Sequence, residues 1–201
     1  MKIIGITGGV GAGKSAVLDY LAEKYNCRVI KADLAAHQLE EPGGACFEPL
    51  VALLGKEILD AAGKIDRQKM AARIFADRGL LQKVNDIVHP AVKQYLLSQI
   101  VKEKESGKRD FLVIEAALLI EEGYAGIVDE LWYIRADESV RRHRLKENRG
   151  YSDEKIDAIL KSQLAEEDFL KHCSVVIENN GALFSVYEQI EKELGADQWQ
   201  K

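Results

Sequence analysis

The sequence predicts an α/β fold, built on a parallel sheet with helices on both faces. Five short apolar runs have the length and composition of buried strands. Segments with a helical spacing of apolar side chains separate these runs, so strands and helices alternate along the chain. A glycine-rich loop joins the first run to the first helical segment. Such alternation is typical of a parallel sheet that is covered on both sides.

The first predicted strand, Lys2–Thr7, reads K-I-I-G-I-T and precedes a helix over Lys14–Lys24. The other four predicted strands are Cys27–Ile30, Phe111–Glu115, Leu131–Ile134 and Ser174–Ile177. Open parallel sheets bind ligands at the carboxyl ends of their strands. The residues that follow each run are therefore the first candidates for a site: the glycine-rich loop, Asp33, Glu115, Arg135 and Asn179–Asn180.

Between about residues 34 and 95 the pattern is helical and contains no convincing strand. Phe47, Leu50, Val51 and Leu54, for example, form one helical stripe. We therefore predict a mostly helical insertion between two pieces of the sheet.

Composition excludes several classes of protein. Of the 201 residues, 47% are hydrophobic and 30% are charged, which is an ordinary globular balance. The net charge of −5 predicts no nucleic-acid partner. The three cysteines are widely spaced and form no C-x-x-C pair, which indicates reduced thiols. The apolar run at the N-terminus is too short for a signal peptide or a membrane span, so we expect a cytoplasmic protein without membrane contact.

The glycine-rich loop matches G-x-x-x-x-G-K-[ST] in full, as Gly8–Ser15 reads G-G-V-G-A-G-K-S. Glycines let successive backbone N–H groups converge on phosphate oxygens, and the following helix presents its positive end to the same anion. We expect Lys14 to bridge the β- and γ-phosphates of ATP and Ser15 to ligate Mg²⁺. The other expected ATP ligands are Gly9, Gly11, Ala12, Gly13 and Ala16. The alternative is a tight glycine turn that binds nothing, but the preceding strand and the following helix favour phosphate binding.

Phosphate loops of this kind (P-loops) occur in kinases, ATPases and GTPases, so the remaining motifs must separate the three. The sequence has no N-K-x-D motif to read a guanine base. Asp60–Gly63 matches D-x-x-G but lies in the helical insertion, and we interpret it as a chance match. A Walker-B strand would end in aspartate, whereas Phe111–Glu115 ends in glutamate. These absences favour a P-loop kinase that acts on a small molecule.

Asp33 follows the second predicted strand and is our candidate for the base that accepts the proton of the acceptor hydroxyl. The alternative is a helix N-cap, because a helical stretch begins at Leu34.

A cluster of arginines follows the fourth predicted strand: Arg135, Arg141, Arg142, Arg144 and Arg149. Arg141 and Arg144 are three residues apart, and Arg142 and Arg149 are seven apart, so each pair shares a helical face. Such a helix next to a phosphate loop is typical of a mobile lid that neutralises charge during transfer. We choose Arg142 and Arg149 as catalytic residues. The alternative is a solvated helix with salt bridges to Glu138 and Glu147.

Taken together, the motifs resemble those of the dephospho-CoA kinase family. They are G-I-T-G-G-V-G-A-G-K-S, I-K-A-D-L-A-A-H, V-H-P, I-E-A-A-L-L-I-E, the arginine-rich helix and V-I-E-N-N-G, in the family's order from Ile3 to Gly181. The resemblance implies that ATP phosphorylates the 3′-hydroxyl of the ribose of dephospho-CoA, which gives coenzyme A and ADP in the last step of coenzyme A biosynthesis. It also implies a nucleotide-binding core (residues 1–35, 91–135 and 163–201), a helical substrate-binding subdomain (36–90) and a lid (136–162).

The resemblance also implies roles for single residues. Asp33 matches the family's carboxylate at the ribose hydroxyl. Asn179 matches the N-N-G turn near the adenine, and the alternative for this dipeptide is an ordinary turn after a strand. The implied substrate-binding residues are Asp33, His37, Arg67, His89, Glu115 and Leu118. For His37 the alternative is plain packing, and for His89 it is a helix end before Pro90. Glu115 and Ala117 stand where the family usually has aspartate and proline, and Arg144 and Arg149 are one residue further apart than in the family's lid.

Two rival functions remain open at this point. A nucleoside or nucleotide kinase would share the loop and the lid but would use another acceptor. A nucleotide-dependent switch would bind ATP without any acceptor-dependent turnover. For the kinase we expect Mg²⁺ as cofactor, ATP and dephospho-CoA as partners, and a monomer or small homo-oligomer.

Overall fold

The computed structural model, which describes residues 1–195 apart from the side chain of Arg78, contains a five-stranded sheet with the order β2-β3-β1-β4-β5. β1 pairs in parallel with β3 and β4, and β4 pairs in parallel with β5. The five predicted strands are confirmed, with ends that differ by at most one residue. Their bounds are β1 Lys2–Thr7, β2 Cys27–Lys31, β3 Phe111–Glu115, β4 Glu130–Arg135 and β5 Val175–Glu178.

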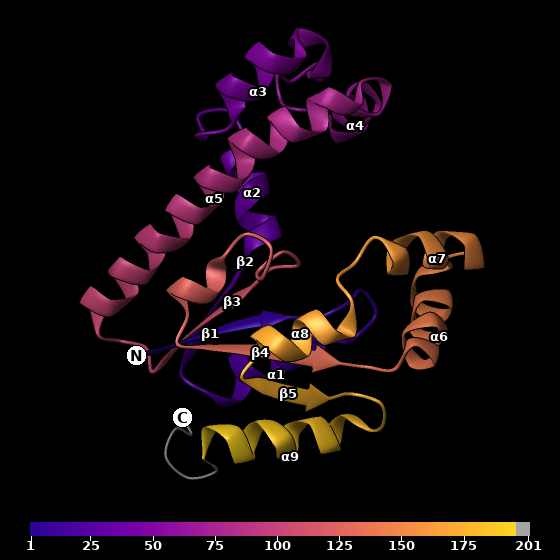
Figure 1. Cartoon of the computed structure of the whole chain (residues 1–201). Helices are drawn as coiled ribbons and strands as arrows, with labels where there is room; N and C mark the ends of the chain where they lie inside the picture. The colour runs from indigo at the N-terminus through magenta and orange to yellow at the C-terminus, as the bar shows by residue number, and fades with distance from the viewer. Residues whose placement is uncertain (196–201) are drawn as a thin grey trace. The chain divides into compact units, whose positions relative to one another are not determined.

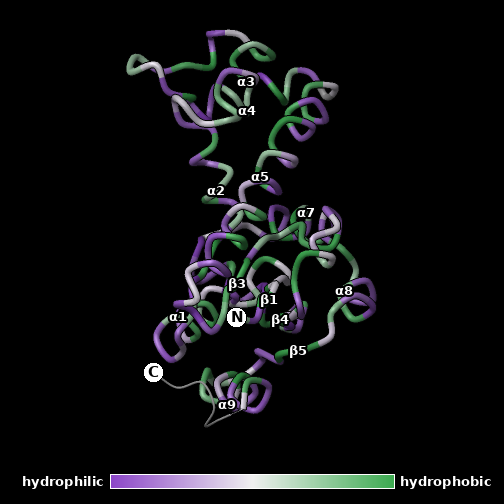
Figure 2. Tube along the Cα trace, turned by 90° about the vertical axis from the view of Figure 1, so that its left-hand side faces the viewer, coloured by the Kyte–Doolittle hydropathy of each residue, from purple (hydrophilic) through white to green (hydrophobic). Residues whose placement is uncertain are grey.

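The central strands β1, β3 and β4 have apolar, buried interiors because both faces of the sheet are covered there. Leu112, Val113 and Ile114 follow one another in β3, and each is fully buried although their side chains alternate between the two faces. Figure 2 shows the hydrophobic colour along β3 and β5. This continuous apolar pattern is what made the strands recognisable in the sequence.

The chain forms two compact units, and the first consists of Met1–Ile30 together with residues 103–195. It contains the sheet and the helices around it (Figure 1). On one face, Val17 of α1 and Val186 of α9 belong to the same buried cluster as Trp132 of β4. On the other face, Phe169 of α8 stacks on Tyr133 of β4 with ring centroids 4.6 Å apart. The helices are α1 Lys14–Lys24, α6 Glu138–Arg149, α7 Asp153–Lys161, α8 Glu166–His172 and α9 Leu183–Leu194, with a 3₁₀ turn at Tyr124–Ile127.

The second unit, Lys31–Lys102, is helical and has a hydrophobic core of its own. Leu50 and Leu54 of α3 pack in this core with Ile58, Leu80 and Val84. The elements are α2 Ala32–Leu39, α3 Phe47–Leu54, a 3₁₀ turn at Lys56–Ile58, α4 Arg67–Ala76 and α5 Arg78–Ser106, whose last turn belongs to the first unit. The predicted stripe of α3 is confirmed, because Phe47, Leu50 and Leu54 are all buried.

Two details of this unit bear on the sequence analysis. Asp60 closes a turn, since its Oδ1 accepts hydrogen bonds of 2.9 Å from the backbone N–H groups of Ala62 and Lys64. A turn explains the D-x-x-G match without any nucleotide chemistry. The helix end that Pro90 suggested is wrong, because α5 runs through Pro90. Pro90 removes one backbone hydrogen bond of the helix, but Val84, Val92 and Leu96 on either side are buried, so packing stabilises both flanking turns.

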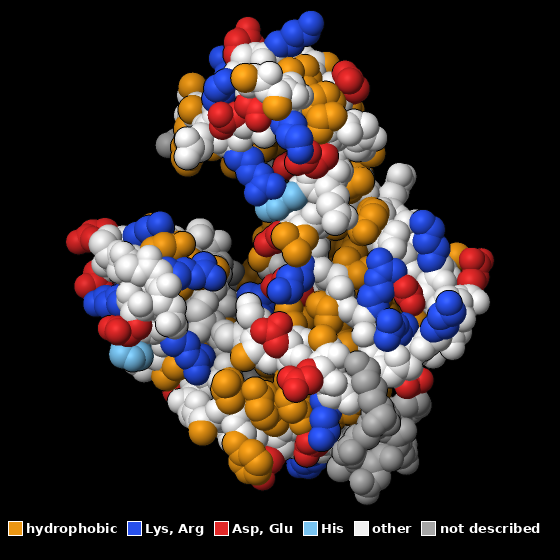
Figure 3. Space-filling view, turned by 180° about the vertical axis from the view of Figure 1, so that it is seen from behind, with side chains coloured by type: hydrophobic (Ala, Val, Ile, Leu, Met, Phe, Trp, Pro, Cys, Tyr) orange, Lys and Arg blue, Asp and Glu red, His pale blue; other side chains and the backbone are white. Residues whose placement is uncertain are grey.

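The surface carries charges of both signs. Figure 3 shows Lys and Arg side chains interspersed with Asp and Glu over the visible face. Among the described residues, no helix combines the length and the apolar character that crossing a membrane requires.

Candidate active site

The turn between β1 and α1 has the geometry of a phosphate-binding loop. β1 ends at Thr7 and α1 begins at Lys14, with the glycine-rich residues 8–13 between them. Gly13 has φ of +90°, and a Cβ atom on it would lie 2.3 Å from Nδ2 of Asn179, so only glycine fits. The N-terminus of α1 has no side-chain cap. Its first N–H groups therefore offer donors to an anion, in the direction that the helix dipole favours.

The amine of Lys14 lies over this loop. Its Nζ donates a hydrogen bond of 2.8 Å to the carbonyl oxygen of Gly8 and lies 3.7 Å from Oε1 of Glu115. Glu115 is the last residue of β3, which neighbours β1 in the sheet. Both side chains are mostly buried, with 15% and 14% of their area exposed. The structure thus brings together a cation and a carboxylate at the carboxyl ends of two adjacent strands.

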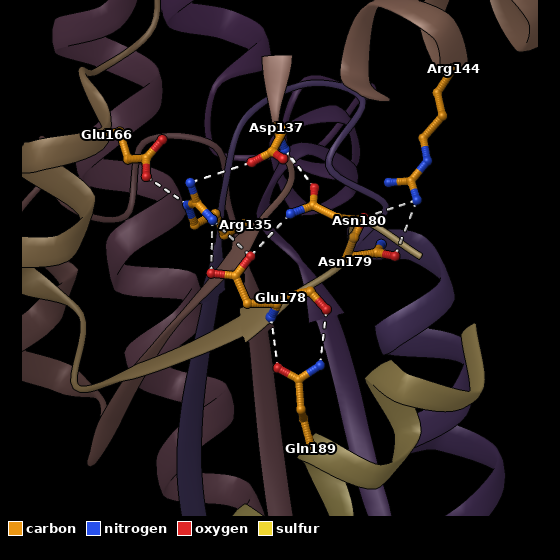
Figure 4. Close-up of polar contacts among 8 residues, drawn as sticks. All are labelled: Arg135, Asp137, Arg144, Glu166, Glu178, Asn179, Asn180 and Gln189. Carbon is orange, nitrogen blue, oxygen red and sulfur yellow. Dashed lines mark hydrogen bonds and ion pairs between the residues drawn. The ribbon is translucent and has the colours of Figure 1, made fainter. Parts of the chain in front are cut away.

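Asn179 connects the end of β5 to the phosphate loop. Its side chain is buried, and Nδ2 donates a hydrogen bond of 2.8 Å to the carbonyl oxygen of Ala12. Arg144 of α6 donates through Nη2 to the backbone oxygen of Asn179 at 3.0 Å and to Oδ1 at 3.2 Å (Figure 4). Nη1 of Arg144 also reaches the carbonyl oxygen of Ala12 at 3.3 Å. The side chain of Asn179 therefore restrains the phosphate loop at Ala12.

Arg135 organises the ends of β4 and β5 (Figure 4). Its guanidinium contacts Glu166 at 2.6 Å, both carboxylate oxygens of Glu178 at 2.9 Å, and Asp137 at 3.3 Å. The hydrogen bonds to Glu166 and Glu178 raise the pKa of Arg135. Asn180 joins the same network, because its Oδ1 accepts a 2.7 Å bond from the backbone N–H of Asp137. Arg135 is held by carboxylates and anchors the start of the segment that contains α6.

Two arginines of α6 face the phosphate loop. Nε of Arg141 donates a hydrogen bond of 2.9 Å to the carbonyl oxygen of Val10, and Arg144 makes the contacts described above. Arg141 and Arg144 are three residues apart and share one side of the helix.

The two arginines chosen from the sequence, Arg142 and Arg149, lie elsewhere on this segment. Arg142 contacts Glu138 at 2.7 Å and also pairs with Asp157. The guanidinium carbon of Arg149 lies 5.9 Å from the centroid of the Tyr151 ring. The alternative for this helix was a solvated face with salt bridges to Glu138 and Glu147, and the pair of Arg142 with Glu138 is of that kind. The role of both arginines in phosphoryl transfer stays a prediction.

Three of the candidate substrate residues lie together in the second unit. Asp33 is in the first turn of α2 and His37 in the last, while Arg67 begins α4. Burial and the positive charge of Arg67 lower the pKa of His37, and Asp33 opposes this shift. The N-cap reading of Asp33 is wrong, because Lys31 occupies the N-cap position and makes no side-chain cap. Asp33 instead lies inside the first turn, where a negative charge complements the helix dipole.

The remaining candidates come from other elements. His89 lies within α5 in the second unit. Glu115 and Leu118 belong to the first unit, and Leu118, in the turns after β3, has 43% of its area exposed.

A family model described as dephospho-CoA kinase matches residues 2–185 of this chain, which is most of its length. The chain belongs to the dephospho-CoA kinase family. The dephospho-CoA kinase of Streptococcus agalactiae serotype V is 35% identical over 189 residues, which cover 94% of this chain and 95% of the relative. That of Carboxydothermus hydrogenoformans is 35% identical over 190 residues, which cover 94% and 91%. The chain is therefore a phosphotransferase by family.

Solved structures agree with this assignment at the level of the fold. TT1252 from Thermus thermophilus is 27% identical with a TM-score of 0.81, and the match covers 98% of both chains. A dephospho-CoA kinase from Campylobacter jejuni has a TM-score of 0.72 at 22% identity over 96% of both chains. A shikimate kinase from Acinetobacter baumannii, at 13% identity and a TM-score of 0.52, shares the fold alone. The predicted kinase fold of this family member is confirmed.

The residues of the loop fit a magnesium ion that is shared with a phosphate. Ser15 is the second residue of α1 and is exposed, so its hydroxyl oxygen is accessible as a hard ligand. In the described part of the chain, no three His, Cys, Asp or Glu side chains come together to hold a metal. In phosphate-binding loops magnesium commonly takes only one or two protein ligands, among them the Ser or Thr of the loop, and completes its shell with phosphate and water. Ser15 as a single protein ligand would be consistent with this coordination.

Three residues of this family member that contact the loop, Arg141, Arg144 and Gln163, were not selected as site residues from the sequence. Arg141 and Arg144 were named within the arginine cluster, but spacing alone does not tell which face of the helix meets the loop. Gln163 follows α7, and its Oε1 accepts a hydrogen bond of 3.3 Å from the backbone N–H of Val10. Gln163 belongs to no motif that the sequence analysis used, so only the fold identifies it.

Proposed function

We propose that the phosphate loop and Asp33 of this chain together transfer the γ-phosphoryl group of ATP to the 3′-hydroxyl of dephospho-CoA. The observation that carries the proposal is the complete loop with Lys14 at its centre, in a chain that matches dephospho-CoA kinases over 94% of its length. The products are coenzyme A and ADP.

On the ATP side, the loop would hold the phosphates. The residues that we expect to contact ATP are Gly9, Gly11, Ala12, Gly13, Lys14, Ser15, Ala16 and Asn179. The amine of Lys14 bonds a carbonyl oxygen of the loop, and a phosphate oxygen is a stronger, charged acceptor at the same place. Ser15 would hold Mg²⁺, which supplies charge neutralisation to the β- and γ-phosphates when it is bound.

On the acceptor side, Asp33 would orient the ribose hydroxyl and accept its proton. The hydroxyl oxygen bonds to the γ-phosphorus while the bond from that phosphorus to the β–γ bridging oxygen breaks, and ADP leaves with the electron pair. Asp33 suits this role because it is a carboxylate two residues after the carboxyl end of β2. We also propose that Arg142 and Arg149 neutralise the transferring group, and that His37, Arg67, His89, Glu115 and Leu118 bind dephospho-CoA.

The proposal extends to the organisation of the chain. Residues 36–90 would bind dephospho-CoA, residues 136–162 would act as a lid, and residues 1–35, 91–135 and 163–201 would form the nucleotide-binding core. We further propose a cytoplasmic enzyme with small-molecule partners, which works as a monomer or small homo-oligomer without nucleic acid or membrane.

The deciding experiment is an acceptor panel. ADP release would be measured with ATP and Mg²⁺ in the presence of dephospho-CoA, adenosine, AMP or cytidine monophosphate, and the phosphorylated product would be identified by mass spectrometry. We expect ADP only with dephospho-CoA, in amounts equal to the coenzyme A formed. A Lys14→Met variant serves as the background control, because it lacks the amine that the phosphates require. Turnover with another acceptor alone would refute the substrate, and binding of ATP without any acceptor-dependent turnover would indicate a switch.

A further inference from the structure

Both ends of the segment that carries α6 and α7 meet the phosphate loop at one residue, Val10. Arg141 lies in the first turn of α6, and Gln163 lies two residues after the end of α7. The backbone N–H of Val10 donates to Oε1 of Gln163 at 3.3 Å, and the carbonyl oxygen of Val10 accepts from Nε of Arg141 at 2.9 Å. A third bond, from Nη2 of Arg141 to Oε1 of Gln163, closes the ring. We call Arg141 and Gln163 the clasp.

The clasp also explains the second glycine of the loop. A Cβ atom on Gly9 would lie 2.3 Å from Nη2 of Arg141 and 2.7 Å from Nη1. The planar guanidinium therefore lies directly against the backbone of Gly9, and any side chain there would push it away. Glycine at position 9 and arginine at position 141 are structurally matched.

The charge of Arg141 has an unusual setting for a surface helix. Among the described residues its guanidinium forms no ion pair with a carboxylate, and its hydrogen-bond acceptors are a carbonyl oxygen and an amide oxygen. Partial burial lowers the pKa of Arg141, and Tyr133, Glu138 and Glu166 oppose this shift. Removing a cation from water without a charged partner is costly, so packing alone is a poor reason for this arrangement.

The orientation of Gln163 follows from its partners. Both the Val10 N–H and the Arg141 Nη2 group are donors, so the amide must present its oxygen to them. The clasp thereby restrains both polar backbone groups of Val10, which is the tip of the loop between Gly9 and Gly11.

We infer that Arg141 and Gln163 are positioning residues, which hold residues 9 and 10 in the conformation that binds the phosphates of ATP. The inference rests on the proposed function, because it concerns the nucleotide that the loop binds. Loop amides bind phosphate well only if they already point in the right directions, since ordering them on binding would cost conformational entropy. The clasp supplies this order from outside the loop motif.

The test compares equilibrium binding of ADP, measured by calorimetry on the full chain, in Arg141→Met, Gln163→Met and the double variant. Each single substitution removes two hydrogen bonds of the ring, and we expect the Kd for ADP to rise about five- to thirty-fold. Because the three hydrogen bonds of the ring depend on one another, the losses should not add. The Kd of the double variant for ADP should be about the same as that of the single variant with the higher Kd. Lys146→Met is the matched control. It removes an exposed lysine of the same helix, which pairs with Asp153 and does not touch the loop, and it should leave the Kd unchanged.

Three further readouts separate positioning from mere structural support. Gln163→Glu keeps an oxygen acceptor for both donors, so it should bind ADP more tightly than Gln163→Met does. In the kinase assay, the clasp variants should raise KM for ATP and leave KM for dephospho-CoA unchanged. Hydrogen exchange of the Val10 amide should accelerate in Gln163→Met, because that N–H loses its acceptor.

An unchanged Kd for ADP in Gln163→Met, or losses that add in the double variant, would overturn the inference. If Arg141→Met fails to fold, the Kd of Gln163→Met for ADP and the exchange rate of its Val10 amide are sufficient to test the inference. ADP binding needs no acceptor, so the clasp is tested even if the chain does not turn over dephospho-CoA. Absence of turnover with dephospho-CoA would reject the proposed function, whereas the ADP-binding data would still test the clasp.

Discussion

At the scale of single residues, the amine of Lys14 is positioned in the phosphate loop, where it could bind an anion. Its amine bonds Gly8 at 2.8 Å and lies 3.7 Å from Glu115. We expect Lys14→Met to lower kcat about a hundredfold or more, because a preorganised cation at the transferring group is lost. The free energy of unfolding in urea should fall by only about 0.5–1.5 kcal/mol, the net contribution of a typical hydrogen bond, which is less than the roughly 2.7 kcal/mol that a hundredfold loss of kcat represents. Lys24→Met at the other end of α1 is the control and should retain turnover.

The second prediction concerns Asp33, the proposed base. Asp33→Asn keeps the size of the side chain but cannot accept a proton, so kcat with ATP and dephospho-CoA should fall by about 10²–10⁴-fold. Helix α2 should persist, since the loss of a favourable charge in its first turn costs only about 0.3–1 kcal/mol. Circular dichroism checks the fold, and Asp19→Asn, an exposed carboxylate of α1, checks for a general effect of charge. Turnover near the wild-type rate in a folded Asp33→Asn variant would remove Asp33 from the mechanism.

At the scale of elements, α4 depends on its first residues because none of its own side chains is fully buried. Oδ1 of Asp66 accepts hydrogen bonds from the backbone N–H groups of Gln68 at 2.9 Å and Lys69 at 3.1 Å. We expect Asp66→Ala to lower the free energy of unfolding by about 1 kcal/mol, because two N–H groups lose their cap. Urea denaturation monitored by circular dichroism measures this loss. Asp86→Ala, in the middle of α5, is the control, and an equal loss there would contradict the capping role.

The elements also show what the sequence can and cannot predict. All five strands were predictable as short, mainly apolar runs, and the central ones leave unbroken runs such as Phe111–Ile114 because both faces are buried. The loop was predictable because its chemistry demands glycines and a lysine at fixed spacing. The contacts of the arginine helix were not, since spacing groups Arg141 with Arg144 without telling which face meets the loop.

Other features depend on residues that are distant in the sequence. Gln163 is an uncharged side chain 153 positions from Val10, and only the path of the chain through α6 and α7 brings the two together. Arg135 was noticed as a strand end, yet its carboxylate partners Glu166 and Glu178 come from later elements. Pairings of this kind are set by tertiary packing, which local sequence patterns do not encode.

At the scale of the whole molecule, the labelling rates of the three cysteines measure the opening of each of the two units separately. Cys27 and Cys173 belong to the first unit and Cys46 to the second. Cys27 and Cys46 are buried, and burial raises the pKa of Cys173 to about 12. The thiolate is the reactive form, so all three should label slowly with a maleimide at pH 7 until the protein opens.

Because the phosphate loop lies in the first unit, ADP should stabilise the first unit against unfolding more than the second. At about 100 times its Kd, a ligand that binds only the folded form stabilises that form by about 2.7 kcal/mol, or roughly a hundredfold in opening. In moderate urea we expect ADP to slow the labelling of Cys27 by up to this factor and to leave the rate at Cys46 unchanged. Mass spectrometry of each cysteine peptide measures both rates in one sample. Equal protection of Cys27 and Cys46 would mean that the two hydrophobic cores unfold as one cooperative unit, even though each has its own set of buried side chains.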